Sequence, residues 1–180
     1  MELIELTPDA MLARWKRAHG FEPLRSDCTV TRTDGPDLDA MLTLQMNNWY
    51  TDTLLHAPLH MLPLTDIASE ISMTVSPTGT AMATLPENCL RVASVMSQGW
   101  EQPALVVDNL QSAEALAQAN PYAAGSTSRP VALVGAGWIK ISPPPEPTDR
   151  LWIMAVAMPD TSRRYILTQA MLSSIKPDTY

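Results

Sequence analysis

The spacing of apolar residues changes near Glu70, and this change constrains the fold more than any other feature. Before Glu70, apolar residues recur every three or four positions, as on one side of a helix. After it they alternate with polar residues, as Ile71, Met73 and Val75 do, which is typical of a half-buried strand. Helical and strand patterns in separate stretches predict the α+β class.

The same spacing predicts where the elements lie. We expect helices over 8–19, 38–57 and 161–175, and a mainly antiparallel sheet over 70–158. A short Ala-rich helix over 112–120 is inserted between strands of this sheet. The two N-terminal helices and the C-terminal helix are therefore expected to form a helical hairpin or bundle packed beside the sheet.

At 180 residues the chain has the length of one domain with a sizeable core. We expect a single domain, 1–180, with a helical part over 1–66 and 160–177 and a β part over 67–159. Residues 21–36 are predicted to be a loop, since they contain Pro and Gly at positions that interrupt the pattern.

Capping residues mark the expected ends of the helices. Asp37 is a good N-cap for the second helix, and Pro58 predicts a kink or break near Ala57. Asp160 or Thr161 is expected to cap the last helix.

The net charge of −7 comes from one continuous stretch. From Thr33 to Leu90 there is no Lys or Arg, while the remaining twelve acids balance the twelve bases elsewhere. The seven acids of this stretch are Asp34, Asp37, Asp39, Asp52, Asp66, Glu70 and Glu87. Such a region repels phosphate and argues against tight nucleic-acid binding. It is either a solvated acidic face or a wall along which DNA passes without sticking.

Candidate catalytic groups are few. His56 and His60 have the i, i+4 spacing of a zinc helix, but Pro58 lies between them and no glutamate follows His56. Cys89 has no positive neighbour in sequence except Arg91, which gives weak support for a lowered thiol pKa, and both Cys28 and Cys89 are interpreted as small buried residues. We therefore predict a protein that is not an enzyme, with no metal or cofactor.

Several short motifs occur in a characteristic order. Ala57-Pro58-Leu59-His60-Met61-Leu62-Pro63 is followed by a hairpin and by Leu85-Pro86-Glu87-Asn88-Cys89-Leu90-Arg91-Val92. Next come Gly99-Trp100-Glu101-Gln102-Pro103, Asn120-Pro121-Tyr122 and Arg129-Pro130-Val131-Ala132. In this order, over roughly residues 37–175, the chain resembles the ring or adaptor proteins of tailed-phage head-to-tail connectors, especially those of crAss-like phages and related prophages.

The resemblance implies a virion structural protein that has no catalytic residues. About twelve copies would form a ring, a dodecamer, between the portal protein and the next tail or ring protein. DNA would pass through its channel without specific binding. The protein would be assembled in the cytoplasm of the bacterial host and would have no membrane partner. Under this hypothesis, the acids that face the channel are Asp37, Asp39 and Asp52.

A low charged fraction, 17%, together with eleven Met and five Trp suits a protein that meets neighbouring copies. The candidate subunit contacts are Met46, Trp49, Trp100 and Trp138. Residues 1–6 lack the apolar run of a secretory signal, and no apolar run approaches the roughly 20 residues of a membrane span.

Two other classes of protein stay open at the level of sequence. One is a binding module of unknown ligand encoded by a phage or its bacterial host, which predicts a concave apolar pocket with convergent polar groups. The other is a small enzyme whose site is assembled from distant residues, which predicts a cleft with strongly perturbed titratable groups.

Overall fold

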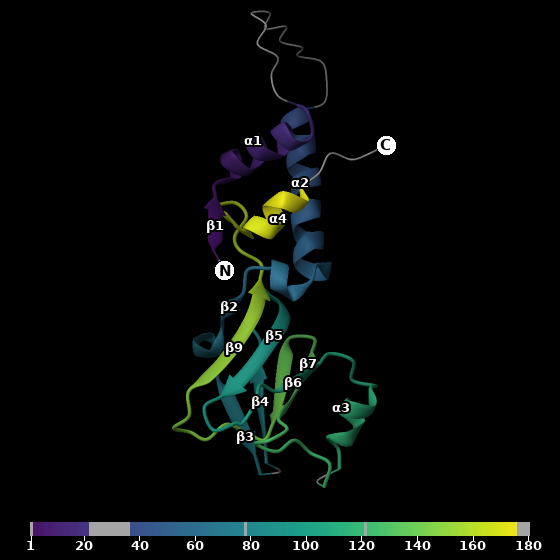
Figure 1. Cartoon of the computed structure of the whole chain (residues 1–180), viewed down its shortest axis with the longest axis vertical. Helices are drawn as coiled ribbons and strands as arrows, with labels where there is room; N and C mark the ends of the chain where they lie inside the picture. The colour runs from purple at the N-terminus through teal and green to yellow at the C-terminus, as the bar shows by residue number, and fades with distance from the viewer. Residues whose placement is uncertain (1, 22–36, 78, 121, 176–180) are drawn as a thin grey trace, which may run out of the picture. The chain divides into compact units, whose positions relative to one another are not determined.

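The computed structural model (Figure 1) describes residues 2–21, 37–77, 79–120 and 122–175. The predicted α+β class is confirmed, with contacting N-terminal helices, mostly antiparallel sheets, a short inserted helix and a C-terminal helix. The chain divides into two compact units, which are described separately. The helical unit comprises Met1–Pro63 and Met158–Tyr180, and the sheet unit comprises Leu64–Ala157. The expected single domain stays a prediction, and the predicted loop over 21–36 lies outside the described residues except for Phe21.

The first helix, α1 (Pro8–Ala18), begins as the sequence predicts. The Thr7 hydroxyl accepts a hydrogen bond from Ala10 N at 3.3 Å, and Pro8 occupies the first helical turn. Met11 and Trp15, one turn apart, are its buried residues. The Trp15 ring lies 5.5 Å from the ring of Trp49, which joins α1 to the second helix.

The second helix, α2 (Leu38–His56), is capped by the Asp37 carboxylate, which accepts hydrogen bonds from Asp39 N and Ala40 N. It ends at the predicted break, because Pro58 follows and the short 3-10 helix η1 (Leu59–Met61) takes its place. Its buried side chains recur every four residues and are Leu42, Met46, Tyr50 and Leu54.

The predicted C-terminal helix over 161–175 is wrong in its first half. The structure has a strand, β10 (Tyr165–Thr168), followed by a shorter helix, α4 (Gln169–Ser174). Asp160 closes a turn instead of capping a helix, since it accepts hydrogen bonds from the backbone and hydroxyl of Ser162. Thr168 is the actual N-cap of α4, accepting from Met171 N at 3.2 Å.

An unforeseen strand, β1 (Leu3–Leu6), pairs antiparallel with β10. The other edge of β10 is covered by a side chain. The Tyr50 hydroxyl donates to Ile166 O at 2.8 Å and accepts from Ile166 N at 3.2 Å, as a neighbouring strand would. Tyr165 of β10 in turn donates to the Asn47 side chain on α2. These hydrogen bonds hold the small sheet against the long helix.

The sheet unit contains two sheets, where the sequence indicated one. The five-stranded sheet has the order β3-β4-β8-β7-β6, and the three-stranded sheet has the order β2-β9-β5. All pairs are antiparallel except β6 with β7. The strands are β2 (Thr65–Asp66), β3 (Met73–Ser76), β4 (Thr80–Thr84), β5 (Cys89–Ser97), β6 (Leu105–Val107), β7 (Val131–Gly135), β8 (Trp138–Ser142) and β9 (Leu151–Ala157). The 3-10 helix η2 (Ala68–Glu70) follows β2.

The core of the sheet unit is formed by the facing sides of these strands. It is built largely of small and β-branched side chains, with Trp100 as its one Trp: among its members are Ala81, Ala83, Ala132, Ile139, Ile141, Val92, Val95, Ile153 and Ala155. The short helix α3 (Ala113–Ala117) covers a second apolar cluster, in which Ala115 packs with Val107, Val131 and Leu133. Ser112 caps α3 by accepting from Ala115 N at 3.2 Å.

Candidate functional site

The side of α2 that faces away from its buried stripe carries three exposed apolar side chains among polar ones. Met41, Leu44 and Leu55 are 50%, 62% and 39% exposed. At about 100° per residue, these three side chains fall on the helix side opposite Leu42, Met46, Tyr50 and Leu54. We call Met41, Leu44 and Leu55 the outer stripe. Met41 and Leu44 are neighbours on this side, three residues apart, whereas Leu55 lies about three turns further along the helix.

The three predicted channel acids do not share one side of α2. Asp37 and Asp52 lie about 60° apart on the same side of α2 as the outer stripe, whereas Asp39 points about 140° or more away from both. The Asp39 carboxylate pairs with Lys16 of α1, with 2.6 Å between Oδ1 and Nζ. Acids that face a channel are expected to lack Lys or Arg partners within their own chain, and for Asp39 this expectation is wrong. Asp52 is 2.9 Å from His56 Nδ1. The channel-facing role of the three acids stays a prediction.

The four predicted subunit contacts fall into two groups. Met46 and Trp100 are 1% and 5% exposed and belong to the cores of their units, so they offer a neighbouring subunit little surface. Trp49 and Trp138 are half-buried. Trp49 packs against Trp15, and the Trp138 ring lies over Gly135, where an added Cβ would come within 2.2 Å of it. The structure thus uses these large side chains mainly for packing within the chain.

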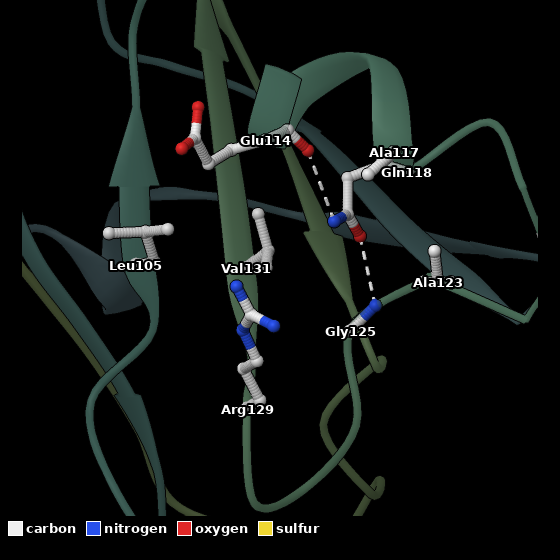
Figure 2. Close-up of a pocket in the computed structure, with 9 residues that line it drawn as sticks. Leu105, Glu114, Ala117, Gln118, Ala123, Gly125, Arg129 and Val131 are labelled. Carbon is white, nitrogen blue, oxygen red and sulfur yellow. Dashed lines mark hydrogen bonds between the residues drawn. The ribbon is translucent and has the colours of Figure 1, made fainter. Parts of the chain in front are cut away.

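A hollow of about 140 Å³ lies between α3 and the edge of the five-stranded sheet (Figure 2). We call it the α3 hollow. Its apolar lining comes from Leu105 of β6, Val131 of β7 and three alanines, Ala117, Ala123 and Ala124. Glu114 and Arg129 supply the charged groups. Within the part of the chain that the structure describes, the Arg129 guanidinium has no ion-pair or hydrogen-bond partner.

One side chain shapes the rim of the α3 hollow. Gln118 Oε1 accepts a hydrogen bond from Gly125 N at 2.9 Å, which ties the loop after α3 to the helix (Figure 2). Gly125 fits there because it has no Cβ, since an added Cβ would lie 2.1 Å from the Ser142 carbonyl oxygen. Beyond this bridge is a wider hollow of about 480 Å³, whose lining includes Lys140, Thr80 and Ser142.

Titratable groups give little indication of chemistry. Burial, together with the charge of Glu70, raises the pKa of the Cys89 thiol, which works against a reactive thiolate. His56 ends α2 and His60 lies in η1. In the described ranges no group of three or more His, Cys, Asp or Glu could hold a metal ion. Cys28 lies outside the described residues. The raised pKa of Tyr50, about 12, has a structural cause, its burial against β10.

Sequence reasoning missed the outer stripe and Arg129. The stripe was visible in principle, since Met41, Leu44 and Leu55 plot on one side of a helical wheel opposite the periodic stripe. The α3 hollow had no comparable signal, because its lining comes from four segments that only the fold brings together.

No protein-family model matches the sequence, and no curated protein matches it significantly. None of the helices among the residues that the structure describes is both long and apolar enough to cross a membrane.

Proposed function

We propose that this chain is a non-enzymatic virion structural protein, a ring subunit of a tailed-phage head-to-tail connector. About twelve copies surround a DNA channel between the portal protein and the next tail or ring protein. The order of short motifs over 37–175 is the source of the connector assignment. The protein is assembled in the bacterial cytoplasm and ends in the virion.

The structural observation that carries the proposal is the outer stripe of α2. Met41 and Leu44, three residues apart on α2, form an exposed apolar pair, and adjoining exposed apolar side chains favour association. In a ring subunit they are covered by a neighbour. The stripe thus supports a protein that works as one part of an assembly.

The DNA channel is supported by charge. The region from Thr33 to Leu90 contains no Lys or Arg, so a ring that turns this region inward repels phosphate and releases no counterions to DNA. Asp39 is the weakest of the three channel candidates, because Lys16 pairs with it. DNA then passes without specific binding.

The hollows are the features that favour the alternative, a binding module for a small ligand. The α3 hollow, at about 140 Å³, is smaller than the roughly 300–1,000 Å³ of ordinary ligand pockets. The wider hollow reaches that size, but its apolar lining is limited to alanines, whereas ligand sites are rich in large apolar and aromatic side chains. We therefore favour the ring subunit.

The proposal is tested by expressing the chain with the portal protein encoded beside its gene and examining the product by electron microscopy. We expect rings of this chain on portals, and the chain among the proteins of purified particles. A chain that stays monomeric beside its portal and is missing from the particles would contradict the proposal. The same images report whether the base-free region lines the channel.

A further inference from the structure

The face of the five-stranded sheet that turns away from the core carries a row of polar side chains. Ala81 and Ile141 pair across β4 and β8 and belong to the core. Because side chains alternate along a strand, Thr80, Lys140 and Ser142 point to the opposite side of the sheet. All three line the wider hollow of about 480 Å³. The floor of this hollow therefore carries two hydroxyl groups and one ammonium group.

The two hydroxyl groups of the wider hollow are enclosed. Thr80 and Ser142 are 9% and 5% exposed. Among the residues that the structure describes, the Thr80 hydroxyl has no hydrogen-bond partner. The Ser142 hydroxyl donates to Gly125 O at 3.5 Å, which is long for a hydrogen bond and is exchanged for a better acceptor at little cost. A mostly buried hydroxyl group without a protein partner favours a hydrogen-bond acceptor in the space beside it.

Lys140 gives the wider hollow a positive charge. Its side chain is half-buried, and in the described part of the chain its ammonium group has no ion-pair or hydrogen-bond partner. The described lining holds no Asp or Glu, since beyond the floor it consists of Gln118, Ala119, Ala124 and two glycines. In a chain of net charge −7, an uncompensated cation in a recess attracts small anions from solution.

The neighbouring α3 hollow differs in its charges. It contains Glu114 as well as Arg129, so an anion that enters it meets a like charge. Gln118 and Gly125 line both hollows, and the hydrogen bond between them marks the boundary (Figure 2). The α3 hollow therefore serves as an internal control for the wider one.

We propose that the wider hollow binds a phosphate group, with Lys140 as its charge partner and the hydroxyl groups of Thr80 and Ser142 as hydrogen-bond donors. Lys binds phosphate as a compact point charge, and hydroxyl donors orient the phosphate oxygens. The volume of the hollow is that of a small-molecule site, so inorganic phosphate and the phosphate monoester of a small alcohol both have room in it. This inference goes beyond the connector function and does not depend on it.

The test is a titration of the full chain with inorganic phosphate, followed by the amide NMR signals at constant ionic strength and about pH 7.5. We expect saturable shifts at Thr80, Lys140 and Ser142, with a Kd on the order of 1 mM. A second titration with glycerol phosphate distinguishes the sources of the phosphate group. Tighter binding of glycerol phosphate assigns the site to a phosphorylated small molecule, and equal binding assigns it to the free ion.

Three variants test the assigned side chains. Lys140→Met keeps the length of the side chain and removes its charge, and we expect it to weaken phosphate binding about tenfold or more. Thr80→Val replaces the hydroxyl by a methyl group of similar size and is expected to weaken binding about fivefold. Arg129→Met is the matched control, because it removes the same charge from the α3 hollow, and it is expected to change the Kd less than about twofold. Circular dichroism confirms that each variant is folded.

The outcomes are separate from those of the connector function. Signals that do not saturate up to about 50 mM phosphate overturn the inference, as do shifts that lie elsewhere on the molecule. If Arg129→Met weakens binding as much as Lys140→Met, net charge and not the wider hollow attracts the anion, which also overturns it. If only Lys140→Met and Thr80→Val weaken binding, the site is assigned. The presence of the chain in particles is judged independently of all these results.

Discussion

The sheet unit and the helical unit stabilise themselves in different ways. The sheet unit buries small and β-branched side chains between two sheets, so its core depends on many modest contacts. The helical unit buries larger side chains, mostly Leu and Met, together with Trp15, Tyr50 and Tyr165. The Tyr50 hydroxyl takes the place of a strand beside β10. The helical unit also leaves the outer stripe of α2 exposed. Exposed apolar side chains occur in both units, so the two units differ in how their cores are held together and not in whether they offer apolar surface.

The largest effect is expected in the sheet unit, at Trp100. Its side chain is 5% exposed and is the largest in the main core. Trp100→Ala is expected to lower the free energy of unfolding by about 3–5 kcal/mol, because it removes a large buried side chain and leaves a cavity. Urea unfolding measures the change. Tyr122→Ala, at a fully exposed aromatic residue, is the control and is expected to change stability by less than about 0.5 kcal/mol. If Trp100→Ala lowers the free energy of unfolding by less than about 1 kcal/mol, Trp100 does not support the core and the predicted role as a subunit contact gains weight.

The next effect tests whether one hydroxyl group really supports the helical unit. Tyr50→Phe keeps the ring but leaves Ile166 N and Ile166 O without their partner. We expect a loss of about 2–3 kcal/mol, since a buried backbone group left unpaired is costly. Hydrogen exchange of the Ile166 amide should speed up in this variant. If the amide stays protected and stability is unchanged, water replaces the hydroxyl and the comparison between the units weakens.

The alkaline pH dependence provides an independent measurement of the same residue. Burial raises the pKa of Tyr50 to about 12, above its ordinary value of 10.0. The folded state therefore holds the phenol proton more tightly than the unfolded state. The stabilisation is complete below about pH 10 and is lost as the pH rises toward 12, by up to about 2 kcal/mol. Burial raises the pKa of Tyr165 in the same direction.

This slope is measured by urea unfolding at intervals of about half a pH unit between pH 9 and 12. The Tyr50→Phe variant should show a smaller loss over the same range, although it starts from a lower stability. Equal slopes in the two proteins would mean that Tyr165, and not Tyr50, accounts for the alkaline dependence.

Local patterns in the sequence were sufficient for the elements whose partners are close in the chain. The helix α2 and the hairpins β3–β4 and β7–β8 follow from apolar spacing, caps and turn residues. The pairing of β1 with β10 joins the two ends of the chain, and no local signal points to it. Residues 165–168, with β-branched and aromatic side chains, favour a strand only once such a partner is available.

The candidate surfaces show the same limit. The outer stripe follows from helical geometry alone, and a helical wheel also separates Asp39 from Asp37 and Asp52. The ion pair between Asp39 and Lys16 depends on how α1 packs on α2, which the sequence does not specify. Arg129 lines the α3 hollow from the segment before β7, opposite the loop that Gln118 and Gly125 tie to α3, and no local pattern predicts this arrangement.

The smallest expected effect decides whether the outer side of α2 is truly free. Leu42 and Leu44 are the same residue type two positions apart, but they are 3% and 62% exposed. Leu42→Ala is expected to cost about 2–5 kcal/mol, because it opens a cavity in the packed side of the helix. Leu44→Ala is expected to change the free energy of unfolding by less than about 0.5 kcal/mol, since both leucine and alanine at this position stay in water. Urea unfolding of dilute protein, where copies do not associate, compares the two variants directly.

If Leu44→Ala is as destabilising as Leu42→Ala, the outer stripe packs against its own chain and is no longer available to a neighbour. A difference of several kcal/mol, by contrast, leaves Leu44 without a role in the monomer and keeps it for a contact between copies.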